Sequence, residues 1–345
     1  MTDEKKSDKK ASKSKPKSSM RKVSAFLVAF VVASVFGASI VSFWLAKNFT
    51  RSHPLMEDRV VEIPFGSGVS KIASILAEEG VIDNPLAFRI VLRFNKLDQN
   101  LKAGEYLFPA GVTPKKVARI LSDGKSILHR ITFAEGLTST EIISLLNGKA
   151  GLKGIVMQTP AEGSLLPETY SFPKGLMRKE IVEQMQFQMT YELNELWAKR
   201  QEDLPFKTRA EAIILASIVE KETGVSMERP EVAGVFVNRL RKKMRLQSDP
   251  TVTYGITLGK EALGRPLSRK DLKTETDYNT YVIRGLPPTP ICNPGLASLA
   301  AVLNPAETDA LYFVADGTGG HAFAKTLKQH NRNVAKWRKI ERSRK

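Results

Sequence analysis

An uncharged apolar run near the N-terminus limits what this chain can fold into more than any other feature. Residues 23–46 carry no charge, and a helix of this length extends about 36 Å, more than the ~30 Å hydrocarbon layer of a membrane. A cleavable signal peptide would have an apolar region of only ~7–15 residues, so the run predicts an uncleaved membrane helix. Small residues at 33–34 and 37–39 are nevertheless compatible with removal of this segment as a signal peptide.

The residues before this helix predict its orientation. Residues 1–22 form a polar, low-complexity tail with nine basic and three acidic residues, a composition that predicts disorder. Because positive charge collects on the cytoplasmic side of membrane helices, we expect the tail in the cytoplasm and the chain after residue 47 on the other side.

The charge across the membrane bears on the choice of partner. Of the formal net charge of +17, the tail contributes +6, so about +11 belongs to the part beyond the helix. Its location argues against nucleic acid as a partner. An acidic envelope polymer, anionic lipid headgroups and a basic surface with no specific partner remain open.

Length and cysteine content limit the fold further. With 345 residues and 42% hydrophobic content, the chain can build two folded domains of ordinary size. The single cysteine, Cys292, excludes an intramolecular disulfide, and we assign it no function.

A strand–glycine–helix unit occurs three times before residue 150. Ile-Pro-Phe-Gly at 63–66, Phe-Pro-Ala-Gly at 108–111 and Phe-Ala-Glu-Gly at 133–136 each end a strand-like run, and apolar residues at helical spacing follow each glycine at identical offsets. Gly68, Thr113 and Thr138 stand at the expected N-caps. We therefore expect a small α+β module at 55–149 and a larger α+β domain at 150–345. The module could bind an extended ligand or act as a spacer from the membrane.

A buried helix is predicted at residues 208–223. Thr208 and Glu211 form a capping box at its start, Gly224 marks its end, and the apolar residues at 212–219 face all sides. The helix nevertheless ends in two carboxylates, Glu220 and Glu222.

Helical spacing separates these two carboxylates. Glu220 shares a face with the small residues Ala216 and Ser217, which leave room for a ligand. Glu222 faces bulky residues or solvent at the last turn. Burial and the helix C-terminus both raise a carboxyl pKa, which suits proton donation to a glycosidic oxygen, although a solvated helix end is the alternative interpretation of both residues.

Four motifs in order resemble one family. They are Ala-Ser-Ile-Val-Glu-Lys-Glu-Thr at 216–223, Leu-Gln-Ser-Asp-Pro-Thr at 246–251, Tyr-Asn-Thr-Tyr at 278–281 and Gly-Leu-Pro-Pro-Thr-Pro-Ile with Asn-Pro-Gly at 285–295. Together they resemble the endolytic murein transglycosylases, the MltG or YceG-like family, and the likeness extends from the membrane helix to the last helix.

The resemblance implies a bacterial inner-membrane enzyme with a LysM-like module and a periplasmic catalytic domain that cuts nascent peptidoglycan strands. It implies Glu220 as the catalytic acid, the residue that the helix faces also favour. No cofactor or metal is implied, and peptidoglycan synthases are candidate partners.

The implied chemistry needs one carboxylic acid. Protonated Glu220 would donate to the oxygen that links MurNAc to GlcNAc, then accept a proton from the MurNAc C6 hydroxyl as that oxygen closes onto C1 to give a 1,6-anhydro end. The internal nucleophile makes a second carboxylate unnecessary, so Glu222, Glu168 and Asp249 need not be catalytic. The candidates for lining the substrate groove are Ser248, Asp249, Tyr254, Asn279 and Tyr281.

Other classes of protein stay open on the residues alone. A thiol hydrolase built on Cys292 and His321 lacks a local nucleophile motif. A metal site of His321, His330 and Asp316 matches no common ligand spacing. The main rival is a non-catalytic scaffold that binds peptidoglycan and recruits cell-wall synthases, which only turnover can distinguish. Should neither Glu220 nor Glu222 prove catalytic, Glu168 is the next candidate acid.

Overall fold

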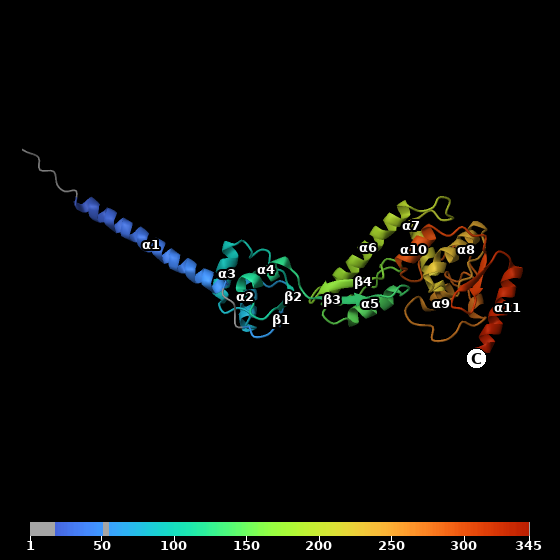
Figure 1. The fold of residues 1–345 in the computed structure, drawn as a ribbon. Coiled ribbons are helices and arrows are strands. Elements are labelled where there is room, and N and C mark those ends of the chain that lie inside the picture. The colour runs from blue at the N-terminus through green and yellow to red at the C-terminus, as the bar shows by residue number, and fades with distance from the viewer. Residues whose placement is uncertain (1–17, 51–54, 345) are drawn as a thin grey trace, which may run out of the picture. The chain divides into compact units, whose positions relative to one another are not determined.

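The computed structural model describes residues 18–50 and 55–344 (Figure 1). Its first element is the long helix α1, Ser18–Thr50, whose stretch Lys22–Thr50 is long and apolar enough to cross a membrane. Its large apolar side chains between Val23 and Phe43 are exposed. Most of the expected disordered tail, residues 1–17, lies outside the described residues, whereas residues 18–22 already belong to the helix.

The chain divides into two compact units, Met1–Ile127 and Leu128–Lys345. After α1, the first unit contains β1 (Arg59–Ile63), α2 (Val69–Glu78), α3 (Pro85–Phe94), β2 (Gly104–Phe108) and α4 (Pro114–Asp123). Strands β1 and β2 pair antiparallel, from Arg59 opposite Phe108 to Ile63 opposite Gly104. Their inward side chains form one core with those of the helices, and Phe49 at the end of α1 joins it, 6.3 Å from the ring of Phe88.

The three sequence repeats form as predicted. Each repeat glycine has a positive φ, 80° at Gly66, 67° at Gly111 and 78° at Gly136, a conformation that favours glycine. A helix begins after each predicted N-cap, and Thr138 with Glu141 completes a capping box. The strand, the left-handed turn and the capped helix of each repeat follow from local chemistry.

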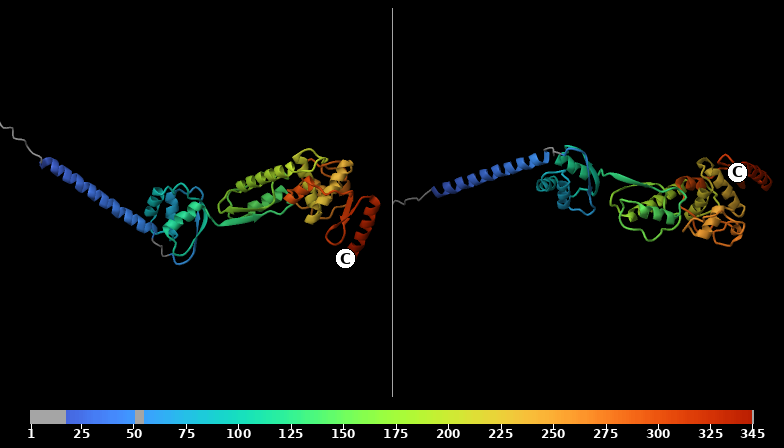
Figure 2. Two further views of the ribbon diagram at one scale, coloured as in Figure 1. Left: turned by 45° about the horizontal axis from the view of Figure 1, so that its top comes forward. Right: turned by 90° about the horizontal axis from the view of Figure 1, so that it is seen from below.

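The third repeat packs with the second unit. Its strand β3 (Leu128–Thr132) pairs antiparallel with β4 (Thr169–Pro173), and its helix α5 (Ser139–Gly148) shares a core with α6 (Arg178–Ala198). Helices α5 and α6 lie along the β3–β4 pair (Figure 2). The contacts thus divide the chain at residue 127, and the expected boundary at 149 lies inside the second unit. The sequence could not reveal this, because β3 pairs with a distant strand: even its nearest pair, Thr132 and Thr169, is 37 residues apart in the chain.

The position of the boundary leads to a first prediction. Residues 55–127 expressed alone should melt cooperatively, because apart from Phe49 all the buried residues of their core come from this stretch. Extension to residue 149 should add no ordered structure, since β3 and α5 then lack β4 and α6. Circular dichroism and amide NMR dispersion of the two fragments provide the measurement. A disordered 55–127 beside a folded 55–149 would contradict the division.

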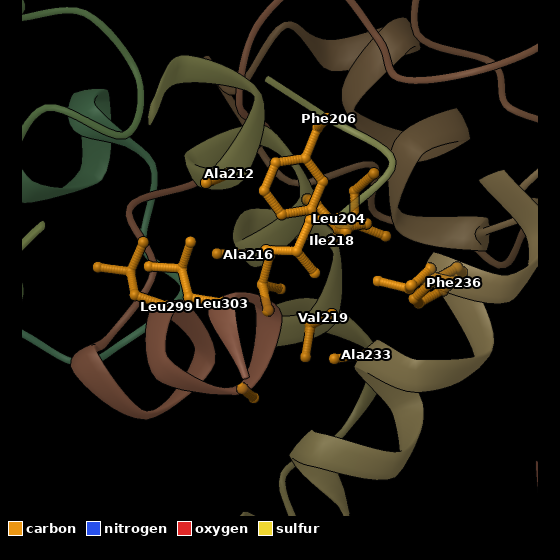
Figure 3. Close-up of a cluster of buried hydrophobic side chains, with 14 of the residues drawn as sticks. Leu204, Phe206, Ala212, Ala216, Ile218, Val219, Ala233, Phe236, Leu299 and Leu303 are labelled. Atoms are coloured by element: carbon orange, nitrogen blue, oxygen red, sulfur yellow. The ribbon is translucent and has the colours of Figure 1, made fainter. Parts of the chain in front are cut away.

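The second unit is built around the predicted buried helix, α7 (Arg209–Glu222). It packs against α8 (Arg229–Arg241), α9 (Asp249–Thr257) and α10 (Leu296–Leu303). Figure 3 shows side chains of α7, α8 and α10 meeting in this core, among them Ala216, Val219, Ala233 and Leu303. Short helices η1 (Ser226–Glu228) and η2 (Asp271–Lys273), the hairpin β5 (Tyr312–Ala315) and β6 (His321–Ala324), and the final helix α11 (Leu327–Ser343) complete the unit.

Candidate active site

A polar cavity of about 510 Å³ lies where the end of α7 meets α8, the start of α9 and the β5–β6 hairpin. Residues from distant parts of the sequence line it: Glu222, Arg239, Leu246, Gln247, Asp249, Tyr281, Tyr312, Phe313, Val314, Ala315, His321, Leu327 and His330. Aromatic rings beside a few convergent polar groups are typical of a ligand site.

Glu222 is the carboxylic acid best placed for proton transfer in this cavity. It is the last residue of α7 and is half-buried. Desolvation by burial raises the pKa of its carboxyl to about 7, and the charge of Asp249 adds to the shift. The Ser248 hydroxyl, His321 and Arg239 partly oppose it. Glu222 therefore neither projects into solvent nor rests only on bulky residues, and the sequence-based description of its surroundings is wrong.

Glu220, the residue favoured by the sequence, lies in a different environment. Its side chain is 5% exposed and does not line the cavity. One carboxylate oxygen, Oε1, accepts a hydrogen bond from Arg229 Nη2 at 3.1 Å, and Oε2 accepts one from the Gly295 backbone N–H at 3.0 Å. Arg229 Nη2 also lies 3.0 Å from Oε2 of Glu135. Both oxygens of Glu220 are thus engaged within the protein.

The space beside the small residues of α7 is occupied by protein. Ser217 Oγ donates to the Ile214 carbonyl and accepts from the Ile291 backbone N–H at 3.0 Å. The Cys292 thiol donates a hydrogen bond to the Ser217 carbonyl oxygen, with a distance of 3.3 Å between Sγ and the oxygen. The proline-rich loop at 284–295 therefore packs where the sequence suggested room for a ligand.

The five predicted groove residues separate into two groups. Asp249 and Tyr281 line the cavity, and the Tyr281 hydroxyl donates to Asp249 Oδ1 at 2.7 Å. Ser248 is buried beside them and does not itself line the cavity. Its hydroxyl interacts with the Glu222 carboxyl and lowers the pKa of that group.

The other two residues have different positions. Tyr254 lines a neighbouring cavity of about 420 Å³ that also includes Asp249, and its ring lies 4.9 Å from that of Tyr278. Asn279 is fully buried. Its Nδ2 donates to the carbonyls of Asp271, Leu272 and Thr274, and its Oδ1 accepts from the Tyr281 N–H. Asn279 therefore holds the loop that presents Tyr281 and lines neither of the two cavities.

The structure also bears on the alternatives. Cys292 is fully buried, burial raises the pKa of its thiol well above the ordinary value, and it does not line the cavity that contains His321. Glu168 is exposed at the start of β4 and is not among the cavity residues. Within residues 18–50 and 55–344, no three His, Cys, Asp or Glu side chains group closely enough to hold a metal ion.

Sequence reasoning missed several residues of this cavity. The sequence analysis did not identify three of them as cavity residues, namely Arg239, Tyr312 and His330, because the sequences of α8, β5 and α11 indicate ordinary structural elements. His321 was considered only as a partner for a thiol or a metal. Four histidines in 345 residues was the only signal that could have drawn attention to His321 and His330, which both line this cavity.

The fold and the cavity define an α+β protein suited to acid–base chemistry on a polar ligand. The chain belongs to the YceG-like family, whose model matches residues 61–336. It is 32% identical over 311 residues to an endolytic murein transglycosylase of Bacillus subtilis (strain 168), covering 80% of this chain and 84% of the relative.

Two further comparisons agree with this family. The chain is 28% identical to an endolytic murein transglycosylase of Streptococcus pneumoniae serotype 2, with 80% of this chain aligned to 57% of that relative's length. A crystal structure of a yceG-like protein from Listeria monocytogenes matches with a TM-score of 0.50 at 30% identity, over 80% of this chain and 99% of the other.

Proposed function

We propose that this chain is a membrane-anchored endolytic lytic transglycosylase that cuts murein glycan strands between MurNAc and GlcNAc and leaves 1,6-anhydroMurNAc ends. Family membership supports the reaction, because the relatives in Bacillus and Streptococcus carry that name. The observation that carries the proposal is the Glu222 carboxyl, which is half-buried on a polar cavity with its pKa raised to about 7.

Glu222 acts as the general acid in this proposal. A carboxyl with a pKa near 7 is about half protonated at neutral pH and largely protonated below it, so it can give its proton to the glycosidic oxygen as the bond to C1 breaks. The positive charge that develops at C1 is met by the C6 hydroxyl of the same sugar, which closes the 1,6-anhydro ring. No water enters the reaction, so a carboxylate that activates water is not required.

This assignment differs from the expectation of Glu220, for a physical reason. An acid must present a protonated oxygen to the substrate, and both oxygens of Glu220 accept hydrogen bonds from Arg229 and Gly295. Glu220 and the buried Arg229 form an ion pair, with Oε1 and Nη2 3.1 Å apart. We therefore propose Glu220 as an anchor that fixes the end of α7 and, with it, Glu222.

The neighbouring groups supply the binding surface in this proposal. Asp249 and Tyr281 present polar oxygens for sugar hydroxyls, and the buried Ser248 supports the Glu222 carboxyl from behind the cavity wall. Because Asp249 borders both the 510 Å³ and the 420 Å³ cavities, a glycan strand could run from Glu222 past Asp249 to Tyr254. An internal cut requires binding on both sides of the bond.

The products of purified glycan strands provide the test. Mass spectrometry of strands incubated with the protein should show new 1,6-anhydro ends and no gain of water. Hydrolysed ends would indicate an ordinary glycosidase, and binding without any cleavage would favour the alternative of a non-catalytic peptidoglycan-binding scaffold that recruits synthases. Either result contradicts the proposed reaction.

We also propose that α1 is an uncleaved anchor in the inner membrane, with its N-terminus in the cytoplasm and both units in the periplasm. Its length and apolar surface support the anchor, and the basic tail supports the orientation. We propose the strand–helix–helix–strand part of the first unit as the LysM-like module, which would keep glycan close to the second unit.

The orientation gives a second prediction. Alkaline phosphatase fused after Lys345 should be active, because this enzyme requires the periplasm, whereas a fusion before residue 18 should be inactive. Activity on indicator medium with matched immunoblots measures both. N-terminal sequencing of the mature protein should find the original start, and a start beyond Ser39 would contradict an uncleaved anchor.

A further inference from the structure

His321 in the Glu222 cavity is held by a second carboxylate, Glu228. Glu228 Oε2 lies 2.7 Å from His321 Nδ1, and Oε1 accepts the His321 backbone N–H at 2.9 Å. Both side chains are largely buried, with exposed fractions of 16% for His321 and 20% for Glu228. A Cβ at Gly320 would lie 2.4 Å from Glu228 Oε1, so glycine allows this close approach. Glu228 thus contacts His321 through both carboxylate oxygens, one at the ring and one at the backbone.

This contact decides how the imidazole can react. A carboxylate at Nδ1 requires the proton on Nδ1, and in the neutral ring that leaves Nε2 as the proton acceptor. The ring is also packed from the side, since Phe313 meets it edge-on with ring centres 5.3 Å apart. Glu228 and Phe313 therefore fix both the tautomer and the plane of the ring, as second carboxylates do for catalytic and metal-binding histidines.

His321 and Glu222 belong to the same cavity. Both line its wall, and His321 is among the groups that lower the pKa of Glu222, so the two interact electrostatically. The other charged or titratable cavity residues are Asp249, bonded to Tyr281, and Arg239, Tyr312 and His330. Of these, His321 is the base whose orientation is set by a buried carboxylate, and the chemistry assigned to Glu222 leaves it without a role.

We propose that His321, positioned by Glu228, is the base of the reaction and takes the proton of the sugar hydroxyl that closes onto C1. The inference rests on the proposed function. The hydroxyl proton goes to Nε2, the hydroxyl oxygen forms the new bond to C1, and the bond from C1 to the bridging oxygen breaks as that oxygen takes the proton of Glu222. The imidazolium then returns a proton to the Glu222 carboxylate, and the enzyme is restored with no water consumed.

Two groups suit this reaction better than one. With a single acid, the same carboxyl must give a proton at the bridging oxygen and then take one from a hydroxyl elsewhere on the sugar. A separate acceptor allows both transfers while C1 carries its positive charge, as the two carboxyl groups of ordinary glycosidases do. Glu228 stabilises the imidazolium that forms in this step.

A purely structural role for the pair is the competing explanation, because it joins η1 to the β5–β6 hairpin. The variant His321→Asn distinguishes this structural role from the proposed role as a base. The Asn amide N–H can still donate to Glu228 at the position of Nδ1, so the join is kept while the acceptor Nε2 is lost. Glu228→Gln is the second variant, since a Gln amide N–H facing Nδ1 moves the ring proton to Nε2 and leaves the geometry intact.

The experiment measures turnover, glycan binding, melting temperature and the chemistry of the new ends on purified glycan strands. Both variants should lose about 10²-fold or more in kcat, the usual contribution of a general base, with KM changed less than about threefold. The residual products of His321→Asn should contain a larger share of hydrolysed ends, because water competes when the hydroxyl is not deprotonated. A loss of structure alone would not move that share.

The matched control is His129→Asn. His129 lies on β3 in the same unit, stacked 5.8 Å from Phe172 and outside the cavity, so it should keep wild-type turnover. Turnover within about threefold of wild type in both folded test variants overturns the role of His321, as does a loss with unchanged end chemistry and a matching fall in melting temperature. Absence of anhydro ends from the wild-type protein would instead contradict the proposed function, so the two failures are distinguishable.

Discussion

Glu222→Gln is expected to lower the turnover of murein glycan strands by about 10²–10⁴-fold, the usual contribution of a general acid. Gln keeps the shape and hydrogen-bonding reach of the side chain and removes only the transferable proton. Glycan binding should therefore survive. The measurement is the rate at which 1,6-anhydro ends appear, followed by mass spectrometry, together with a pull-down on insoluble peptidoglycan.

Glu220→Gln is the matched control, since it makes the same change two residues away on the same helix. At a temperature where the variant is folded, it should lose far less turnover than Glu222→Gln, because Glu220 does not line the cavity and a Gln side chain can still accept a hydrogen bond that holds the end of α7. If the Glu220 variant is folded and inactive while the Glu222 variant still makes anhydro ends, the acid is Glu220, as the motif resemblance implied. If both stay active, the acid lies elsewhere.

The local elements of the fold could be read from the sequence because their causes are local. A glycine in the left-handed region, a side-chain cap and an apolar stripe at helical spacing lie within about fifteen residues of one another, as at Gly136, Thr138 and Ile142. What could not be read is which strand each repeat would pair with. The β3 strand pairs with β4, across the intervening helix α5, and that choice moves the third repeat into the second unit.

The sequence predicted which side chains share a helix face in the site, but it did not predict their neighbours, for a related reason. Helical spacing correctly separated Glu220 from Glu222, but the neighbours of each are set by loops far away in the sequence. Ile291 and Gly295 fill the face that small residues leave open on α7. The hairpin that carries His321 encloses the other face and makes the helix end a cavity wall. Spacing within one helix cannot show which face a distant loop will cover.

The two carboxylates should also differ in what they do to stability. Glu220→Gln leaves the buried Arg229 with Glu135 as its only carboxylate partner at ion-pair distance within the described residues. The partly exposed Glu135 then compensates the charge of Arg229 alone, so we expect a loss of about 1–3 kcal/mol in the free energy of unfolding, below the cost of a buried charge with no partner. Chemical denaturation at pH 8 measures it, and a loss below about 0.5 kcal/mol would contradict the role of Glu220 as an anchor.

Glu222→Gln should instead stabilise the protein at pH 8. The pKa of Glu222 is about 7 in the folded protein against an ordinary value of 4.5, so above pH 7 the carboxylate is ionised in both states and burial penalises only the folded one. This cost appears as the pH rises from about 4.5 to about 7 and is absent below that window.

Removing the charge should therefore gain roughly 1–3 kcal/mol at pH 8, allowing for the contact of the side chain with the open cavity, and almost nothing at pH 4. Melting temperatures of wild type and variant at the two pH values measure the difference. Glu211→Gln, on the first turn of α7, is the comparison. Its effect on stability should have the opposite sign, because hydrogen bonds from Lys207 and Thr208 lower the pKa of the Glu211 carboxyl. A carboxyl kept for proton transfer should thus show two effects when it is neutralised: the protein becomes more stable at pH 8 but not at pH 4, and turnover is lost. A structural carboxylate such as Glu220 behaves differently, because its neutralisation lowers stability.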